Sequence, residues 1–290
     1  MSRRLVLGTA QFGLPYGIAN QTGRVAPSAV RHILADARDS GVDTLDTAIA
    51  YGDSESALGD ANVAGWQIIS KLPGMPDDCG DCATWVRQQL EGSLRRLRVD
   101  ALHGLLLHRP EQLLGGQGAA LARTLRELRR EGLVAKVGVS IYAPQELEAL
   151  LQVLDIDMVQ APLSVLDQRM IVSGWADRLK AAGIELHVRS VFLQGLLLMA
   201  RGDRAEKFDR WDGLWQEWER WLQATEIPAI NACLRFALSV PSVDKVVVGV
   251  DSLEQLRGIL AVTQAPLPDL PVWPSPIDTD LVNPARWSAL

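Results

Sequence analysis

The clearest indication of the fold comes from residues 42–72, VDTLDTAIAYGDSESALGDANVAGWQIISKL. An apolar run at 42–46 ends in an acid, a helical pattern follows at 54–65, and a second apolar run occupies 66–72. Both runs are apolar on both faces, which is typical of strands in a parallel sheet that helices cover. The stretch therefore predicts a strand, a helix and a second strand parallel to the first.

The same unit recurs along the whole chain. Apolar runs predict eight strands, at 5–10, 42–46, 66–72, 101–108, 134–140, 157–162, 184–191 and 244–250. Helical patterns follow these strands at 28–41, 54–65, 82–99, 118–132, 144–154, 167–183, about 206–239 and 252–262. Several helices end in a glycine before the next strand, as at Gly41, Gly132 and Gly183. Eight such units are the number that closes a (β/α)8 barrel, which is an α/β fold.

An open, doubly wound sheet is the alternative arrangement of the same elements. It would carry a G-x-G-x-x-G turn after the first strand, and GTAQFG (8–13) and GLPYG (13–17) lack that spacing. No linker divides the chain, so we expect residues 1–290 to form one domain. The proline-rich tail, residues 265–284, should run extended over one face of the barrel.

Composition excludes several classes of function. The 290 residues include 29 Lys and Arg against 35 Asp and Glu, and no basic stripe is available to bind nucleic acid. No stretch of eighteen consecutive apolar residues predicts a membrane span, and the N-terminus does not resemble a signal peptide. Three cysteines, an odd number in a long chain, favour a reducing cytoplasm. The oligomeric state stays open.

Polar residues follow three successive predicted strands. Asp46 and Tyr51 come after the second strand, Lys71 lies near the end of the third, and His108 ends the fourth. Barrel enzymes place their chemistry at the carboxyl ends of the strands, so these side chains should meet at one rim. Each could singly be a helix cap or a solvated side chain. Their order on adjacent strands favours one catalytic site.

The motifs that hold these four residues, GVDTLDTAIAYGDSE, ISKLP and LLLHRP, resemble those of the aldo-keto reductase family. The segments LGTAQFG, KVGVS, VQ, QGLL and VVVGV with LEQL resemble that family too. The resemblance covers nearly the whole chain. It implies a TIM-barrel oxidoreductase that reduces a small aldehyde or ketone with NAD(P)H.

The residue types suit carbonyl reduction. The family takes a hydride from a reduced nicotinamide, and the protein supplies a proton. The resemblance makes Tyr51 the general acid, whose pKa of about 10 falls beside an ammonium such as that of Lys71. Asp46 would hold Lys71 in an ion pair, and His108 would donate to the carbonyl oxygen as negative charge develops there.

The resemblance also implies a cofactor site. Ser140 and Gln160 match positions that bind the nicotinamide carboxamide, although Ile141 replaces the usual asparagine. Arg189 replaces an aromatic residue that stacks on the nicotinamide; its planar guanidinium can also stack, and an ordinary ion pair is the alternative. The implied cofactor contacts are Gly8, Thr9, Ala10, Ser140, Gln160, Arg189, Ser190, Val191, Phe192, Gln194, Gly249, Asp251, Ser252 and Gln255, and no metal site is implied.

The adenosine end departs further from the family. Asp251 stands where a basic residue usually binds the 2′-phosphate, and Ile259 replaces the usual asparagine. A carboxylate there would repel a phosphate and suit a ribose hydroxyl. Arg257 could compensate, so NADPH is the first candidate and NADH the alternative.

Two further motifs have simpler explanations. CGDC, residues 79–82, precedes a predicted helix, where a thiol pKa can fall, but its acidic surroundings favour a plain loop-to-helix turn over a redox role. Trp211, Trp215 and Trp218 share one helix face, which is typical of core or of a docking surface.

A second class of function stays open. The altered cofactor contacts would also suit a non-catalytic nicotinamide-binding redox sensor or regulatory scaffold.

The sequence does not identify the substrate. A sugar-derived aldehyde is the candidate, because GTAQFGLPYGI, which includes Tyr16, resembles sugar-handling relatives.

Overall fold

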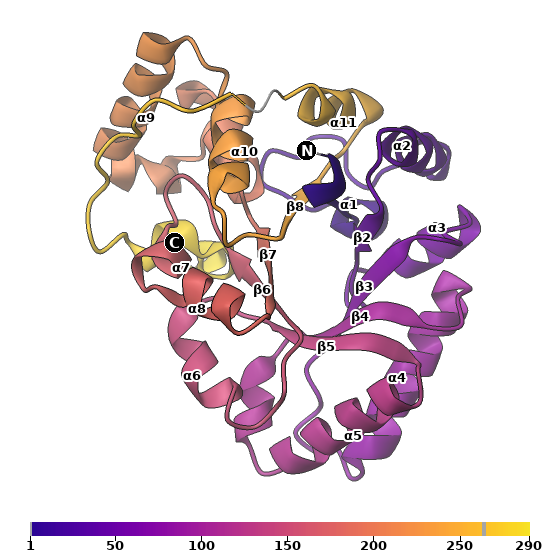
Figure 1. The fold of residues 1–290 in the computed structure, drawn as a ribbon. Helices are drawn as coiled ribbons and strands as arrows, with labels where there is room; N and C mark the ends of the chain where they lie inside the picture. The colour runs from indigo at the N-terminus through magenta and orange to yellow at the C-terminus, as the bar shows by residue number, and fades with distance from the viewer. Residues whose placement is uncertain (1, 263–264) are drawn as a thin grey trace.

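Eight parallel strands form a closed barrel in the computed structural model, which describes residues 2–262 and 265–290 (Figure 1). The strands neighbour one another in chain order, and the last pairs with the first. Each predicted strand is present to within two residues at either end, which confirms the (β/α)8 barrel. The strands are β1 (Leu5–Gly8), β2 (Thr44–Asp46), β3 (Gln67–Leu72), β4 (Leu102–Leu107), β5 (Val134–Ser140), β6 (Met158–Pro162), β7 (Glu185–Arg189) and β8 (Lys245–Gly249).

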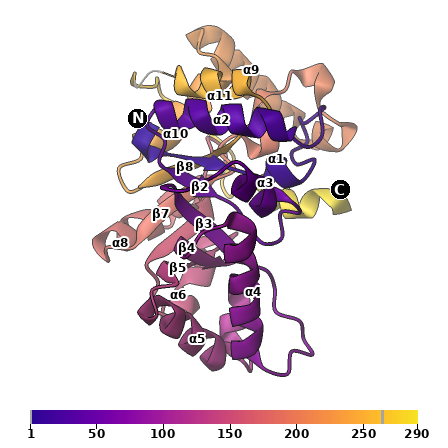
Figure 2. The ribbon, with the colours of Figure 1, turned by 90° about the vertical axis from the view of Figure 1, so that its right-hand side faces the viewer.

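Helices surround the barrel, with α2 against α11 and α3 against α4 (Figure 2). They pack through apolar faces, as in α5, where Leu121, Leu125 and Leu128 are buried at helical spacing. No described helix is both long and apolar enough to cross a membrane. The α-helices are α1 (Ala10–Gly13), α2 (Pro27–Asp39), α3 (Ser54–Asp60), α4 (Cys82–Leu97), α5 (Gly118–Arg130), α6 (Leu147–Leu150), α7 (Arg169–Val172), α8 (Trp175–Ala181), α9 (Asp212–Thr225), α10 (Ala229–Ser239), α11 (Leu253–Leu260) and α12 (Thr279–Val282).

Two long predicted helices are interrupted. The segment 167–183 forms α7 and α8, which Gly174 separates with a positive φ of 74° that a glycine adopts without strain. The segment 206–239 begins with a 3₁₀ helix and continues as α9 and α10, which are divided before Pro228. Proline lacks the N–H that a helix interior requires, so a new helix starts after it. The prediction of one continuous helix was wrong in both places.

The C-terminal tail is extended only in its first part. Residues 265–278 have no regular structure, and α12 and a 3₁₀ helix over 284–289 follow. Trp221 donates its indole N–H to the Asp269 carbonyl, which ties the tail to α9 (Figure 1). An apolar cluster joins Leu281 and Trp287 of the tail to Trp218 and to the loops after β6 and β7. These loops leave the carboxyl ends of the strands, so the tail covers part of that face.

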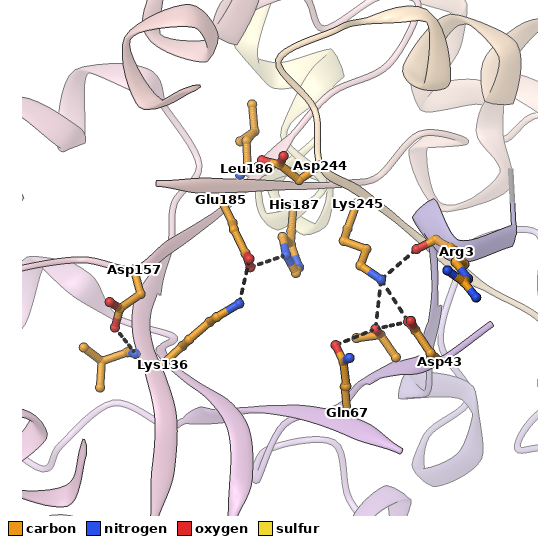
Figure 3. A network of polar contacts seen from close by, with 12 residues as sticks. Arg3, Asp43, Gln67, Lys136, Asp157, Glu185, Leu186, His187, Asp244 and Lys245 are labelled. Atoms are coloured by element: carbon orange, nitrogen blue, oxygen red, sulfur yellow. Dashed lines mark hydrogen bonds and ion pairs between the residues drawn. The ribbon is translucent and has the colours of Figure 1, made fainter. Parts of the chain in front are cut away.

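Polar side chains cross the amino-terminal end of the barrel (Figure 3). Lys136 donates to Glu185 at 2.6 Å, and Lys245 donates to Asp43 at 2.9 Å. His187 Nε2 lies 3.4 Å from the Glu185 carboxylate. These contacts come from β5, β7 and β8 and from the residue before β2, so polar side chains occupy this end of the barrel and the opposite end is left for a ligand.

Candidate active site

A buried ion pair joins the ends of β2 and β3. Lys71 Nζ donates to Asp46 Oδ1 at 2.6 Å and to the Thr47 carbonyl at 2.9 Å. Only 1% of the Lys71 side chain and 5% of the Asp46 side chain are exposed. Burial opposes the charge of Lys71, but Asp46 and Tyr51 beside it outweigh that effect, so the pKa of Lys71 lies above its usual value. Lys71 is therefore a fixed cation.

Tyr51 lies on the loop between β2 and α3, directly over this pair. Lys71 Nζ is 5.1 Å from the centroid of the Tyr51 ring. The loop passes so close to α1 that a Cβ on Gly13 would lie 1.8 Å from the Tyr51 carbonyl oxygen. Ser54, the first residue of α3, donates to the Thr9 carbonyl at 2.8 Å and so ties the loop to β1. The loop that carries Tyr51 is therefore packed against α1 and tied to the end of β1.

A second buried carboxylate anchors α3, and the sequence reasoning missed it. Glu55 is 1% exposed and accepts hydrogen bonds from Ser70 and Ser93, both at 2.6 Å. Arg96 of α4 pairs with its other oxygen at 2.7 Å. Ser70 precedes Lys71 on β3, so Glu55 links the helix after Tyr51 to the strand that carries Lys71. An acid at the start of a helix normally suggests only a dipole effect.

His108 follows β4 and completes the group. Its ring lies edge-on to the Tyr51 ring, with 6.0 Å between centroids. Burial, the charge of Lys71 and the charge of Arg189 lower the pKa of His108 from 6.5 to about 4. The imidazole is therefore neutral at neutral pH, and one ring nitrogen carries a hydrogen that it can donate. The structure thus brings together all four residues expected from the strand ends.

A cavity of about 340 Å³ opens at the carboxyl ends of the strands, with Asp46 and Tyr51 in its wall. Lys71 and His108 do not line it. Twelve residues expected at a cofactor line it: Gly8, Thr9, Ala10, Gln160, Arg189, Ser190, Val191, Phe192, Gln194, Gly249, Asp251 and Gln255. Ser140, which is buried, and Ser252, which caps α11, do not. Sequence reasoning missed other lining residues on the first loop and after β7, among them Gln11, Ala19, Asn20, Leu198 and Met199.

Gln160 connects the ion pair to this cavity. Its Nε2 donates to Asp46 Oδ2 at 2.7 Å, and a carboxylate only accepts, so the amide orientation is fixed. Gln160 is one of the residues that line the cavity, and its Oε1 atom is buried and accepts no hydrogen bond from residues 2–262 or 265–290. An amide donor would satisfy it, so this atom fits the carboxamide of a nicotinamide.

Arg189 lies against an aromatic ring of the protein. Its guanidinium carbon is 4.5 Å from the centroid of Tyr142, and it donates to the Ile141 carbonyl at 3.1 Å. Within the described part of the chain no carboxylate pairs with Arg189, which removes the ordinary ion pair as an explanation. One face of the guanidinium stacks on Tyr142, and the residue lines the cavity.

The loop after β1 reaches over the cavity to the ends of β7 and β8. Asn20 donates to Asp251 Oδ1 at 3.0 Å, and Gln194 donates to the Tyr16 hydroxyl at 3.1 Å. Burial raises the pKa of Asp251 above its usual value. Arg257, expected as a compensating cation, instead pairs with Asp36 at 2.8 Å and does not line the cavity.

Comparison with known families identifies the chain. The model of the aldo/keto reductase family matches residues 4–271. The chain belongs to the aldo-keto reductase family. This assignment agrees with the motifs at the ends of β2, β3 and β4.

Individual relatives are more distant. A region of 147 residues is 29% identical to the 6-dehydroglucose reductase of Novosphingobium aromaticivorans, and it covers 45% of this chain and 47% of that protein. The match thus spans about half the length of this curated relative. An aldo-keto reductase of Bacillus halodurans in its holo form superposes with a TM-score of 0.70, at 20% identity over 91% of this chain and 87% of that one. The glycerol dehydrogenase of Gluconobacter oxydans also gives 0.70, at 21% identity over 91% and 88%. These superpositions support the fold.

The remaining cysteine and tryptophan motifs of the chain have structural roles. Cys79 and Cys82 are free, and burial, Cys79 and Asp81 raise the pKa of Cys82, contrary to a reactive thiol. Asp81 caps α4 by accepting from the Ala83 N–H at 3.1 Å. Trp215 and Trp218 are buried in the cluster with the tail. No group of three or more potential metal ligands is present in the described part of the chain.

Proposed function

We propose that this reductase converts an aldehyde or ketone to the alcohol at the carboxyl end of the barrel, with NAD(P)H as cofactor. The observation that carries the proposal is the buried Lys71–Asp46 pair beneath Tyr51, with a neutral His108 beside the phenol. Tyr51 in the cavity wall, with a fixed cation beneath its ring and a neutral donor beside it, supplies the groups that protonate a carbonyl oxygen.

Each of the four side chains has one proposed task. Tyr51 gives its proton to the carbonyl oxygen, and Lys71 stabilises the phenolate that remains. Asp46 keeps the lysine in place and balances its charge. His108 donates a hydrogen bond to the same oxygen as negative charge develops there. A bound reduced nicotinamide supplies the hydride to the carbonyl carbon.

The cavity wall offers partners along the length of a dinucleotide. We infer that Gln160 Oε1 accepts from the carboxamide and that the free face of Arg189 stacks on the nicotinamide ring. Residues 190–194 would contact the pyrophosphate and Gly249, Asp251 and Gln255 the adenosine. NADPH stays the first candidate by family. The Asp251 carboxylate and the engagement of Arg257 by Asp36 support NADH as the alternative.

The substrate proposed is a small polar carbonyl compound, with sugar-derived aldehydes first. One relative is named a 6-dehydroglucose reductase, and a structural neighbour is named a glycerol dehydrogenase.

We also infer that the chain forms a single domain, because Phe192 and Phe236 pack against both apolar clusters. We infer a cytoplasmic location as well.

The experiment follows the absorbance of the reduced nicotinamide with a panel of aldehydes and ketones, including sugar-derived ones, using NADPH and NADH separately. We expect oxidation of the cofactor with at least one carbonyl. Tight binding of cofactor with no turnover on any carbonyl would favour the redox sensor, for which the unusual contacts of Arg189 and Asp251 are the supporting observation.

A further inference from the structure

Gln160 lies between the Asp46–Lys71 ion pair and the cavity in which we propose that the nicotinamide binds. It lies on β6, and its register partner on β5 is Ser140. The Gln160 side chain is 1% exposed, so its amide makes its contacts away from bulk water. One end of that amide donates to Asp46, and the other is buried without a hydrogen-bond partner among the described residues, in a residue that lines the cavity.

We propose that Gln160 is a positioning residue that couples occupancy of the nicotinamide subsite to the Asp46–Lys71 ion pair. This rests on the proposed function, because the partner inferred for Oε1 is the carboxamide. The coupling extends the function of Gln160 beyond cofactor binding, since the same rigid amide holds the oxygen of Asp46 that Lys71 does not use.

The geometry leaves the amide one orientation while Asp46 is a carboxylate. Rotation by half a turn would place Oε1 against Asp46 Oδ2, two acceptors in a buried site, which is unfavourable. The Asp46 charge therefore fixes an acceptor at the cavity wall. A group that donates to this acceptor polarises the amide and strengthens its hydrogen bond to Asp46.

The coupling can be measured from cofactor dissociation constants alone, because the effects of two coupled groups on each other are equal. If the carboxamide strengthens the hold of Gln160 on Asp46, then Asp46 strengthens the binding of the carboxamide by the same factor. The affinity for a cofactor fragment that lacks the nicotinamide should not depend on Gln160 or Asp46. This contrast separates coupling from general damage to the site.

The test is a double-mutant cycle on dissociation constants, measured by quenching of tryptophan fluorescence. Wild type, Gln160→Leu, Asp46→Asn and the double variant are titrated with NADPH and with 2′-phospho-ADP-ribose, which lacks the nicotinamide. NADH and ADP-ribose are used in parallel. Thermal unfolding shows which variants are folded.

We expect Gln160→Leu to weaken the dinucleotide about tenfold, and Asp46→Asn to weaken it a few-fold, because an amide at position 46 lets Gln160 rotate. If Asp46 acts on the dinucleotide only through Gln160, the double variant should bind it about as weakly as Gln160→Leu alone, which is a few-fold tighter than the product of the two losses predicts. The fragment should bind every variant within about twofold of wild type. Additive losses on the dinucleotide would overturn the coupling.

A control and a second variant complete the cycle. Ser140→Ala, on the strand beside Gln160 and without contact to Asp46, should be additive with Asp46→Asn. If Gln160→Leu does not fold, Gln160→Asn keeps an amide that is too short to reach both partners, and it should show the same non-additivity. If wild type binds neither dinucleotide, the proposed function fails and the coupling fails with it; binding with additive losses refutes the coupling alone.

Discussion

At the scale of single residues, the decisive feature is a lysine without contact to bulk water. Lys71 is 1% exposed, and its ammonium has a carboxylate and a carbonyl as its hydrogen-bond acceptors. Such a charge persists only where partners replace its hydration, and removing one partner of a buried pair costs roughly 3–5 kcal/mol. The ring of Tyr51 lies over this buried pair, 5.1 Å from the Lys71 Nζ atom.

Lys71→Met should lower turnover by about a thousandfold or more, because Tyr51 loses the cation that stabilises its phenolate. The measurement is kcat with the best carbonyl from the panel. Lys136→Met removes a lysine from the opposite end of the barrel and is the matched control, with turnover expected within about twofold. A loss under tenfold in Lys71→Met would remove the lysine from the mechanism.

The sequence predicted that four polar residues meet at one rim because barrel topology brings the ends of neighbouring strands together. Asp46, Lys71 and His108 lie at or beside the ends of β2, β3 and β4, so the proximity of these three did not depend on loop paths. Glu55 and Asn20 were missed because their contacts depend on how a helix and a loop return to the barrel. The bond between Gln160 and Asp46 joins β6 to β2 across the barrel, and no sequence spacing encodes such a contact.

At the scale of elements, apolar patterns located the strands but not the breaks within helices. All eight strands were predicted because each is an apolar run that helices and barrel interior bury on both sides. The helical pattern continues through Gly174 and through Pro228, so periodicity alone joined helices that the backbone separates. The tail was expected to be extended, and α12 was missed because only four residues form it.

The loop after β1 contacts Asp251 through Asn20, at the end of the cavity where we propose that the adenosine binds. Asp251→Arg should tighten NADPH by roughly ten- to a hundredfold, because a repulsion of the 2′-phosphate becomes an attraction, and it should change NADH little. Dissociation constants at low and high salt measure this.

Asn20→Ala is the control for that substitution. It breaks the same hydrogen bond to the loop but keeps the carboxylate, so it should not tighten NADPH. If Asp251→Arg leaves NADPH affinity unchanged at low salt, Asp251 does not face the 2′-phosphate.

At the scale of the whole molecule, the barrel carries a polar group at each end. The amino-terminal network holds Glu185 against His187 and Lys136, and these contacts lower the pKa of Glu185 to about 2 despite its partial burial. Between the two ends, Ile69, Leu106 and Met158 form a buried apolar layer. The two polar groups are therefore separate in space and should be separable in function.

The network should make stability fall in acid. A carboxyl whose folded pKa is depressed stabilises the fold above its unfolded value of 4.5, and that stability is lost as the pH falls from 4.5 towards about 2. Burial also lowers the pKa of the nearby His103 below its unfolded value of 6.5. The unfolded chain therefore binds this proton more tightly, so stability falls further as the pH drops below 6.5. Glu185→Gln should remove roughly 1–2 kcal/mol of the change in unfolding free energy between neutral and acid pH. This value allows for solvent screening, because the Glu185 side chain is partly exposed.

Denaturant unfolding over a series of pH values measures this, and turnover at neutral pH should stay within about twofold. Asp60→Asn, which removes an exposed ion pair with Arg98, is the control and should leave the pH dependence unchanged. A Glu185→Gln variant that loses stability equally at every pH would show that the network acts through packing.

In the proposed mechanism Tyr51 gives its proton to the carbonyl oxygen. The direct measurement compares wild type and Tyr51→Phe, with saturating cofactor and the best carbonyl, for turnover and for cofactor affinity. We predict a loss of about a hundred- to ten-thousandfold in turnover, with the dissociation constant of the cofactor within about threefold of wild type. Turnover within tenfold of wild type would contradict the assignment of Tyr51 as the acid.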